Sequence, residues 1–233
     1  IVYARDGAWI ASAASDRTIR IWDPLSGKEL RKVEGHTSDI ETLALSPDGK
    51  LLASSSNDTT VRLWDTATWR PAGRPLRGEP GGDGLAFSPD HATLAVAGGA
   101  GHVELWDVAT RRIVRRLTDP AAVPGQAALG GVAFSPDGRV VAAAGVETNH
   151  VTLWNTATGR VIGRPITPHA HVSGVQAVAF SPDSKRIAVE AQLGTVGIWE
   201  VATGRRVGRI AVGSDAVEEA IYADGGRTLI VSD

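Results

Sequence analysis

The 233-residue chain contains neither cysteine nor methionine. Without cysteine it can form no disulfide, no zinc–thiolate site and no cysteine nucleophile. Because it also lacks an initiator methionine, we expect the sequence to be a fragment of a longer protein. No apolar run approaches the roughly 18 residues of a membrane span, and residues 1–9 lack the basic and apolar regions of a signal peptide. We therefore expect a cytoplasmic protein without a membrane partner.

The sequence also lacks a marked excess of charge of either sign. Its net charge is −2 and 42% of its residues are hydrophobic, which is typical of an ordinary folded domain and argues against disorder. Its apolar segments are short and are separated by glycine- and proline-containing turn sequences. This pattern favours short strands over helices, so the sequence predicts an all-β fold.

Two short patterns recur along the whole chain. The first is a turn pattern, ALSPDG at 44–49 and AFSPDG at 133–138, with further or degenerate copies that begin at residues 2, 86, 179 and 220. The second is a strand that ends in Trp-Asp or a close variant, and its tryptophans are Trp22, Trp64, Trp106, Trp154 and Trp199. The turn patterns start 42, 42, 47, 46 and 41 residues apart, and the tryptophans are 42, 42, 48 and 45 residues apart. A period of this size with four short strand patterns is typical of a propeller blade.

The repeat resembles that of the WD40 family, and the resemblance extends over the whole chain. It implies a single WD40 β-propeller domain, whose blades are antiparallel sheets of four strands, a to d, stacked around an axis. We place the blades at about 1–34, 35–77, 78–118, 119–168, 169–211 and 212–233, the last being partial. Five blades and a half blade are part of a ring that in this family most often has seven, so we expect the chain alone not to close.

The recurring tryptophans are expected to lie in the core between blades, because an isolated blade cannot bury both of its apolar faces. Trp69 is a different case. It stands where the turn between strands c and d usually has glycine, and we expect its side chain to be exposed.

The resemblance further implies a hydrogen-bonded tetrad of histidine, serine or threonine, aspartate and the strand-c tryptophan. In the second unit these residues are His36, Ser54 or Ser56, Asp58 and Trp64, and the two serines share one strand face. Elsewhere the tetrad decays. The position of Asp58 keeps an aspartate, Asp16, in the first unit but is occupied by Ala100, Thr148 and Leu193 in the next three.

Serine, histidine and aspartate in one unit also suggest a hydrolase triad. We reject it because each residue occupies a structural position of the repeat and no serine lies on a strand-to-helix elbow. His169 and His171 could share one strand face, but no third ligand follows at a recognisable metal spacing. We expect no catalytic residue, no metal ligand and no cofactor.

Many arginines fall in the c–d turns or in strand d, and together they form a basic outer belt: Arg70, Arg74, Arg77, Arg111, Arg112, Arg115, Arg116, Arg160, Arg164, Arg205, Arg206 and Arg209. Nucleic-acid binding is one interpretation of such a belt. Charge that blocks edge-to-edge strand pairing is the other, and we favour it because no aromatic residues are interleaved and the net charge is −2.

Repeat length varies only at certain connections. From a strand-c tryptophan to the next turn pattern there are 22 residues in the first two units but 27 and 25 in the next two, and one extra residue precedes His150. These insertions fall in d–a and b–c connections, which open onto one rim of a propeller. Insertions in repeat proteins gather on the face that is free to diversify for binding, although simple drift in loop length is the alternative. We place a partner site at 118–129, 146–150 and 167–174, with candidate contacts Gln126, Glu147, Asn149, His150, His169 and Ser173.

The function implied by the resemblance is a non-catalytic scaffold that binds a protein or peptide. Related bacterial proteins are often fused to a protein kinase or a signalling NTPase, and such a fusion outside this chain is implied in the same way. An enzymatic propeller of the lactonase or quinoprotein type is one alternative, which the Trp-Asp strand ends disfavour. A periplasmic TolB-like propeller is another, which the lack of a visible export signal disfavours.

Overall fold

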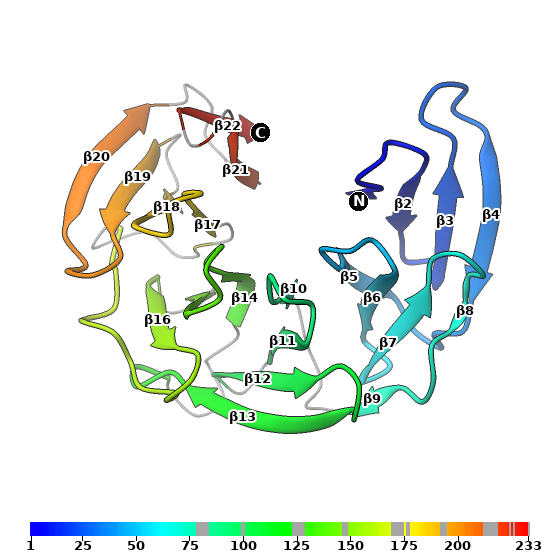
Figure 1. The fold of residues 1–233 in the computed structure, drawn as a ribbon, viewed down its shortest axis with the longest axis horizontal. Coiled ribbons are helices and arrows are strands. Elements are labelled where there is room, and N and C mark those ends of the chain that lie inside the picture. Colours follow the sequence, from blue (N-terminus) through cyan, green and yellow to red (C-terminus); the bar gives the residue numbers. More distant parts are fainter. Residues whose placement is uncertain are drawn as a thin grey trace.

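The computed structural model describes residues 1–77, 84–98, 101–122, 129–145, 149–168, 175, 178–191, 195–211, 219–223, 225 and 227–232. Within these residues the strands form six antiparallel sheets, which follow one another around an arc from the N-terminus to the C-terminus (Figure 1). The predicted all-β propeller fold is confirmed. The two ends of the arc stand apart in Figure 1, and the number of blades in a complete ring stays a prediction.

The first three sheets use their strands in chain order. Sheet 1 contains β1 (Val2–Tyr3), β2 (Ile10–Ala13), β3 (Thr18–Trp22) and β4 (Glu29–Glu34). Sheet 2 contains β5 (Ile40–Leu45), β6 (Leu51–Ser56), β7 (Thr60–Asp65), β8 (Arg70–Pro71) and β9 (Leu76–Arg77), and both β8 and β9 pair with β7. Sheet 3 contains β10 (Gly84–Phe87), β11 (Thr93–Ala97), β12 (His102–Asp107) and β13 (Arg112–Thr118).

The last three sheets keep the same order. Sheet 4 contains β14 (Leu129–Phe134), β15 (Val140–Gly145) and β16 (Val151–Asn155). Sheet 5 contains β17 (Val178–Phe180), β18 (Arg186–Ala191), β19 (Thr195–Glu200) and β20 (Arg206–Ala211). Sheet 6 contains β21 (Glu219–Ala223) and β22 (Thr228–Ser232). Among the described residues, no helix has the length and apolar character of a membrane span.

The recurring turn pattern closes the a–b hairpin by the same contacts in successive sheets. In sheet 2, Oγ of Ser46 donates to Oδ1 of Asp48 at 2.7 Å and accepts the amide hydrogen of Leu51 at 2.9 Å. Gly49 then reverses the chain with a φ of +72°, which side chains rarely allow. The equivalent serine–aspartate contacts are 2.5, 2.6 and 2.6 Å in sheets 3, 4 and 5. This rim, which we call the turn rim, is therefore stiff and regular.

The hydrophobic core is divided into clusters that lie between successive sheets. Trp64 of sheet 2 packs in a cluster with Ile19 and Ile21 of sheet 1, and Trp154 of sheet 4 packs with Leu105 of sheet 3. Trp106 and Trp199 occupy the same place in the next clusters along the chain. These four tryptophans are at most 6% exposed, so stacking of one sheet on the next buries them.

Arginines of an outer strand and of the turn before it link neighbouring sheets. Nη2 of Arg115, on β13, donates to the carbonyl oxygen of Ala157 at 2.9 Å, and Nη1 donates to that of Thr158 at 3.3 Å. In the same way Nη1 of Arg111 reaches the carbonyl oxygen of Arg74 in sheet 2 at 3.2 Å. Part of the basic belt therefore stabilises the packing of neighbouring sheets.

Candidate partner-binding rim

Sheet 2 carries a continuous chain of hydrogen bonds from its core to the rim formed by the d–a and b–c connections. Nε1 of Trp64 donates to Oγ of Ser54 at 2.8 Å, and this oxygen lies 2.7 Å from Nε2 of His36. Nδ1 of His36 lies 2.8 Å from Oδ2 of Asp58. Ser56, the alternative hydroxyl, donates instead to a backbone carbonyl. The structure therefore brings His36, Ser54, Asp58 and Trp64 into one network.

A neutral imidazole and an ionised carboxylate satisfy this network. The Ser54 hydroxyl can donate to Nε2 of His36, while the hydrogen on Nδ1 is donated to Asp58. Burial lowers the pKa of His36 below its usual value and outweighs the opposite effect of Asp58. Burial raises the pKa of Asp58, but hydrogen bonds from Thr60, the Thr37 amide and His36 bring it to about 2.

Asp58, His36 and Ser54 lie in the order and at the distances of a hydrolytic triad. Ser54 is nevertheless fully buried, with 0% of its surface exposed. Its oxygen also accepts the indole hydrogen of Trp64. This bond occupies a lone pair of the oxygen that a serine nucleophile would need for attack. The arrangement ties the segment before β5 to the turn between β6 and β7, which is a structural role.

Sheet 3 satisfies its tryptophan differently. Val96 stands ten residues before Trp106, where sheet 2 has Ser54, so this position offers no hydroxyl. Nε1 of Trp106 donates instead to Oε2 of Glu104 at 3.1 Å. Glu104 is 2% exposed. Its Oε1 accepts a hydrogen bond from Nε of Arg116 at 3.0 Å and lies 3.0 Å from Nη2 of the same arginine in an ion pair. An arginine of the outer belt therefore neutralises a buried carboxylate.

Sheet 4 contains a histidine–aspartate pair in which the two residues have exchanged places. Asp119 follows β13, in the kind of connection that supplies His36 in sheet 2, and His150 directly precedes β16. Nε2 of His150 lies 2.7 Å from Oδ2 of Asp119, and the two side chains are 7% and 1% exposed. Oγ1 of Thr152 donates to Oδ1 of Asp119 at 3.1 Å.

The carboxylate of Asp119 is stabilised in its charged form. Burial raises its pKa, but hydrogen bonds from His150, the Ala121 amide and Thr152 outweigh this effect and hold the pKa below its usual value. The Asp119–His150 pair also connects two of the segments that contain insertions, 118–129 and 146–150. Neither partner was identified from the sequence as part of such a pair, because 31 residues separate them and no local pattern relates them.

The proposed partner contacts divide into three groups. The expectation that His150 lies exposed to a partner is wrong, because its side chain is buried against Asp119. Asn149 is half-buried and has a positive φ of 50°. The other four candidates, Gln126, Glu147, His169 and Ser173, lie outside the described residues.

The expectation for Trp69 is also wrong. Its ring is half-buried and stands edge-on to the ring of Trp9, with centroids 4.9 Å apart and an interplanar angle of 79°. Trp9 belongs to sheet 1, so this contact joins the first two sheets on the turn rim.

The described residues include no group of three or more histidine, aspartate or glutamate side chains placed to hold a metal ion. His169 and His171, the pair considered from the sequence, lie outside that part of the chain. The titratable groups found at the rim act instead as partners of one another.

Antiparallel sheets stacked face to face, with a tryptophan between successive sheets, define a β-propeller of the WD type. The family model described as "WD domain, G-beta repeat" matches residues 1–23, 27–65 and 163–200. The chain is also 49% identical over 41 residues to "Nuclear distribution protein PAC1-2" of Postia placenta (strain ATCC 44394 / Madison 698-R). The match covers 18% of this chain and 10% of that protein. The chain therefore contains repeats that match the WD40 family in these three segments.

Proposed function

We propose that this chain is a non-catalytic scaffold that binds a protein or peptide on the rim formed by its d–a and b–c connections. WD40 repeats are generally protein-interaction modules, which supports the class of function. The choice of rim is supported by the contrast between the two edges of the sheets. The turn rim repeats one set of serine–aspartate contacts, whereas the opposite rim varies in length and in its buried polar partners.

The observation that carries the proposal is the Asp119–His150 pair. It joins two insertion-bearing segments at their base, so residues beyond it can differ in sequence while their attachment to the sheets stays fixed. A rigid base beneath variable connections is the usual arrangement of a recognition surface.

Site-specific crosslinking tests which rim is used. A photoreactive residue is placed at Ala121, which is exposed beside Asp119, and in a control chain at Lys185, which is exposed on the turn rim. We expect the source cell extract to give a defined protein adduct from position 121 and none from position 185. Adducts from position 185 alone, or from neither position, would contradict the proposal.

We extend the proposal to the cellular setting that the family resemblance suggested. The chain would act in the cytoplasm, and a kinase or NTPase domain of the same polypeptide would be brought to the partner bound by the propeller. Determination of the full-length coding sequence tests this, since a secretion signal or the lack of any attached signalling domain would reject it.

A further inference from the structure

The turn rim contains two cavities at equivalent places in the repeat. The first lies between sheets 1 and 2, has a volume of about 270 Å³, and includes Asp6, Trp9 and Thr66 in its lining; we call it the Trp9 pocket. The second lies between sheets 3 and 4, has a volume of about 210 Å³, and includes Asp90 and Thr156; we call it the Thr93 pocket. Because the two cavities lie at the same place in the repeat, a comparison of their lining residues shows which features belong to the Trp9 pocket alone.

The turn pattern of sheet 1 departs from the others in the residues that face the Trp9 pocket. Ala4, Arg5 and Trp9 replace Ser88, Pro89 and Thr93 of the Thr93 pocket. In the sequence this copy of the pattern simply looked degenerate. In the structure its changes are gathered around one cavity.

The replacement of the serine by Ala4 changes the hydrogen bonding of the aspartate in this turn, Asp6. In the Thr93 pocket, Oγ of Ser88 holds Oδ1 of Asp90 at 2.5 Å. Ala4 cannot do this, and Oδ1 of Asp6 accepts only the Ala8 amide at 3.0 Å among the described residues. Within that part of the chain, Oδ2 of Asp6 accepts no hydrogen bond and forms no ion pair, so one carboxylate oxygen is available to a ligand.

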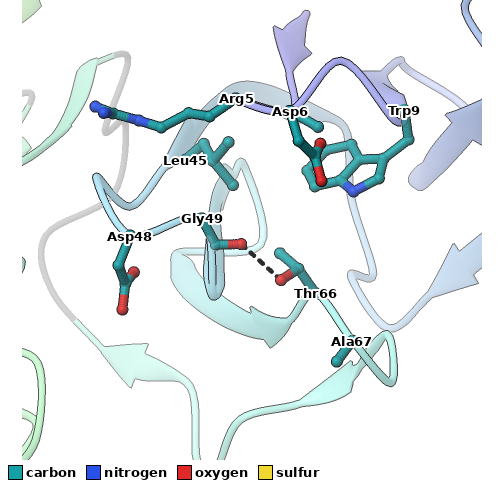
Figure 2. A pocket seen from close by; sticks show the side chains of 9 residues that line it. Arg5, Asp6, Trp9, Leu45, Asp48, Gly49, Thr66 and Ala67 are labelled. Carbon is teal, nitrogen blue, oxygen red and sulfur yellow. Dashed lines mark hydrogen bonds between the residues drawn. The ribbon is translucent and has the colours of Figure 1, made fainter.

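Trp9 places an aromatic surface beside that carboxylate. Its edge-on contact with Trp69 fixes the indole, which remains partly exposed and lines the cavity. Asp6 and Trp9 both line the cavity, and in Figure 2 their side chains lie on the same side of the view, whereas the Arg5 side chain extends the other way. An aromatic ring and a free carboxylate on one wall are the two groups that attract a guanidinium or ammonium ion.

We propose that the Trp9 pocket binds the basic side chain of a peptide, arginine or lysine. The cavity is smaller than the roughly 300–1,000 Å³ of drug-sized ligand sites, which suits one side chain. The cationic group contacts Asp6 and the face of Trp9, and the exposed guanidinium of Arg5 is available to an acidic group elsewhere on the same peptide. This site is separate from the rim assigned to the main partner and does not depend on that assignment.

Titration of the 233-residue chain with N-acetyl-arginine amide tests the proposal, followed through the indole Nε1 resonance of Trp9. Trp9→Phe assigns this resonance. N-acetyl-citrulline amide has nearly the same shape without the charge, and we expect it to bind at least about fivefold more weakly. Asp6→Asn, which keeps an acceptor for the Ala8 amide, should weaken arginine amide by a similar factor.

The matched control is Asp90→Asn in the Thr93 pocket, which should change the affinity by less than about twofold. Equal binding of the citrulline and arginine compounds would overturn the proposal, because charge would then play no part. An undiminished affinity in Asp6→Asn, or a Trp9 resonance that does not move, would overturn it as well.

Discussion

Nε2 of His150 lies 2.7 Å from Oδ2 of Asp119, and this contact joins the connection after β13 to the beginning of β16. His36 and Asp58 make the corresponding contact in sheet 2, but there the histidine comes from the d–a connection and the aspartate from the b–c turn. The fold therefore retains an imidazole–carboxylate bond across this rim while the two sides exchange the groups that form it. Because both pairs are buried, each stabilises the fold only while both of its partners are present, since a buried polar group without a partner is destabilising.

Removing His150 should loosen the base of two insertion-bearing segments. We expect His150→Ala to lower the free energy of unfolding by about 1 to 3 kcal/mol, because it removes a hydrogen bond from the buried carboxylate of Asp119. Hydrogen exchange should speed up at 119–122 and at 149–152. Arg160→Ala, which shortens an exposed side chain after β16, is the control and should leave exchange at 119–122 unchanged. Equal effects of the two substitutions would mean that the pair does not hold the segments together.

The tetrad predicts a similar loss in sheet 2. Asp58→Ala should lower the free energy of unfolding by about 1 to 3 kcal/mol, since it leaves Nδ1 of buried His36 without an acceptor. Asp58→Asn, which keeps an acceptor, should lose less. Asp16→Ala removes the equivalent aspartate of sheet 1, which bonds Thr18 and Arg20 and no histidine, and should also lose less. Urea unfolding measures all three, and a loss below a few tenths of a kcal/mol for Asp58→Ala would reject the role of the pair.

The free energy of unfolding should decrease below neutral pH, because both members of the His36–Asp58 pair have shifted pKa values. Because the pKa of folded His36 is below 6.5, the unfolded chain takes up the proton more readily, so stability is full above pH 6.5 and decreases as the pH falls below it. The pKa of Asp58 is about 2 against 3.8 for the free group. Its contribution, about 2 kcal/mol, is present above pH 3.8 and is lost as the pH falls toward 2.

Urea unfolding of the wild-type chain and of Asp58→Asn at a series of pH values checks this. The stability difference between the two chains should narrow as the pH falls from about 4 to about 2, because protonation removes the carboxylate that distinguishes them. A difference that stays constant over this range would show that Asp58 does not titrate with a lowered pKa.

The features that the sequence predicted correctly are local or strictly periodic. Strand alternation, the Ser-Pro-Asp-Gly turn and the tryptophan spacing each involve residues within one unit, and each has a direct counterpart in the sheets. The same holds for the bonds of His36, Ser54 and Trp64, which the family resemblance implied within one unit.

Contacts between residues on different strands or sheets could not be predicted, because a repeat pattern relates only residues that are close together in the sequence. Trp69 was expected in solvent because its turn position is exposed in isolation, but Trp9 of the preceding sheet covers it. His150 follows an insertion and looked like a loop residue, yet it directly precedes a strand and its ring turns inward to Asp119. Glu104 occupies an inward position where a carboxylate is unexpected, and its partner Arg116 was assigned to the outer belt. In each case the deciding partner lies on another strand or sheet.

The contact between Trp9 and Trp69 should offset backbone strain. Trp69 has a φ of +58°, where the turn of sheet 4 has Gly159 at +71°, and such a conformation costs a bulky residue on the order of 1 kcal/mol. Trp69→Gly removes this strain together with an aromatic contact of similar size, so we expect a net change below about 1 kcal/mol. A double-mutant cycle with Trp9→Ala should give a coupling of about 0.5 to 1.5 kcal/mol.

Arg111→Gly is the matched control for this cycle. Arg111 occupies the same turn position in sheet 3 with a φ of +58°, but it has no aromatic partner among the described residues. It should show no coupling to Trp9→Ala. Coupling of Trp69 that is no larger than that of Arg111 would show that the two rings do not stabilise each other.

The triad-like order of Asp58, His36 and Ser54 leads to the prediction that the folded chain does not hydrolyse esters at this site. Ser54 is 0% exposed and its oxygen accepts the Trp64 indole hydrogen, so an acyl group can reach it only if sheets 1 and 2 separate. A fluorophosphonate probe should therefore leave Ser54 unlabelled in the native chain, as identified by peptide mass spectrometry. Hydrolysis of p-nitrophenyl acetate should be the same for the wild-type chain and for His36→Ala, each checked for native circular dichroism. Hydrolysis that His36→Ala abolishes in a folded chain would show that the buried network opens and acts as a catalytic site.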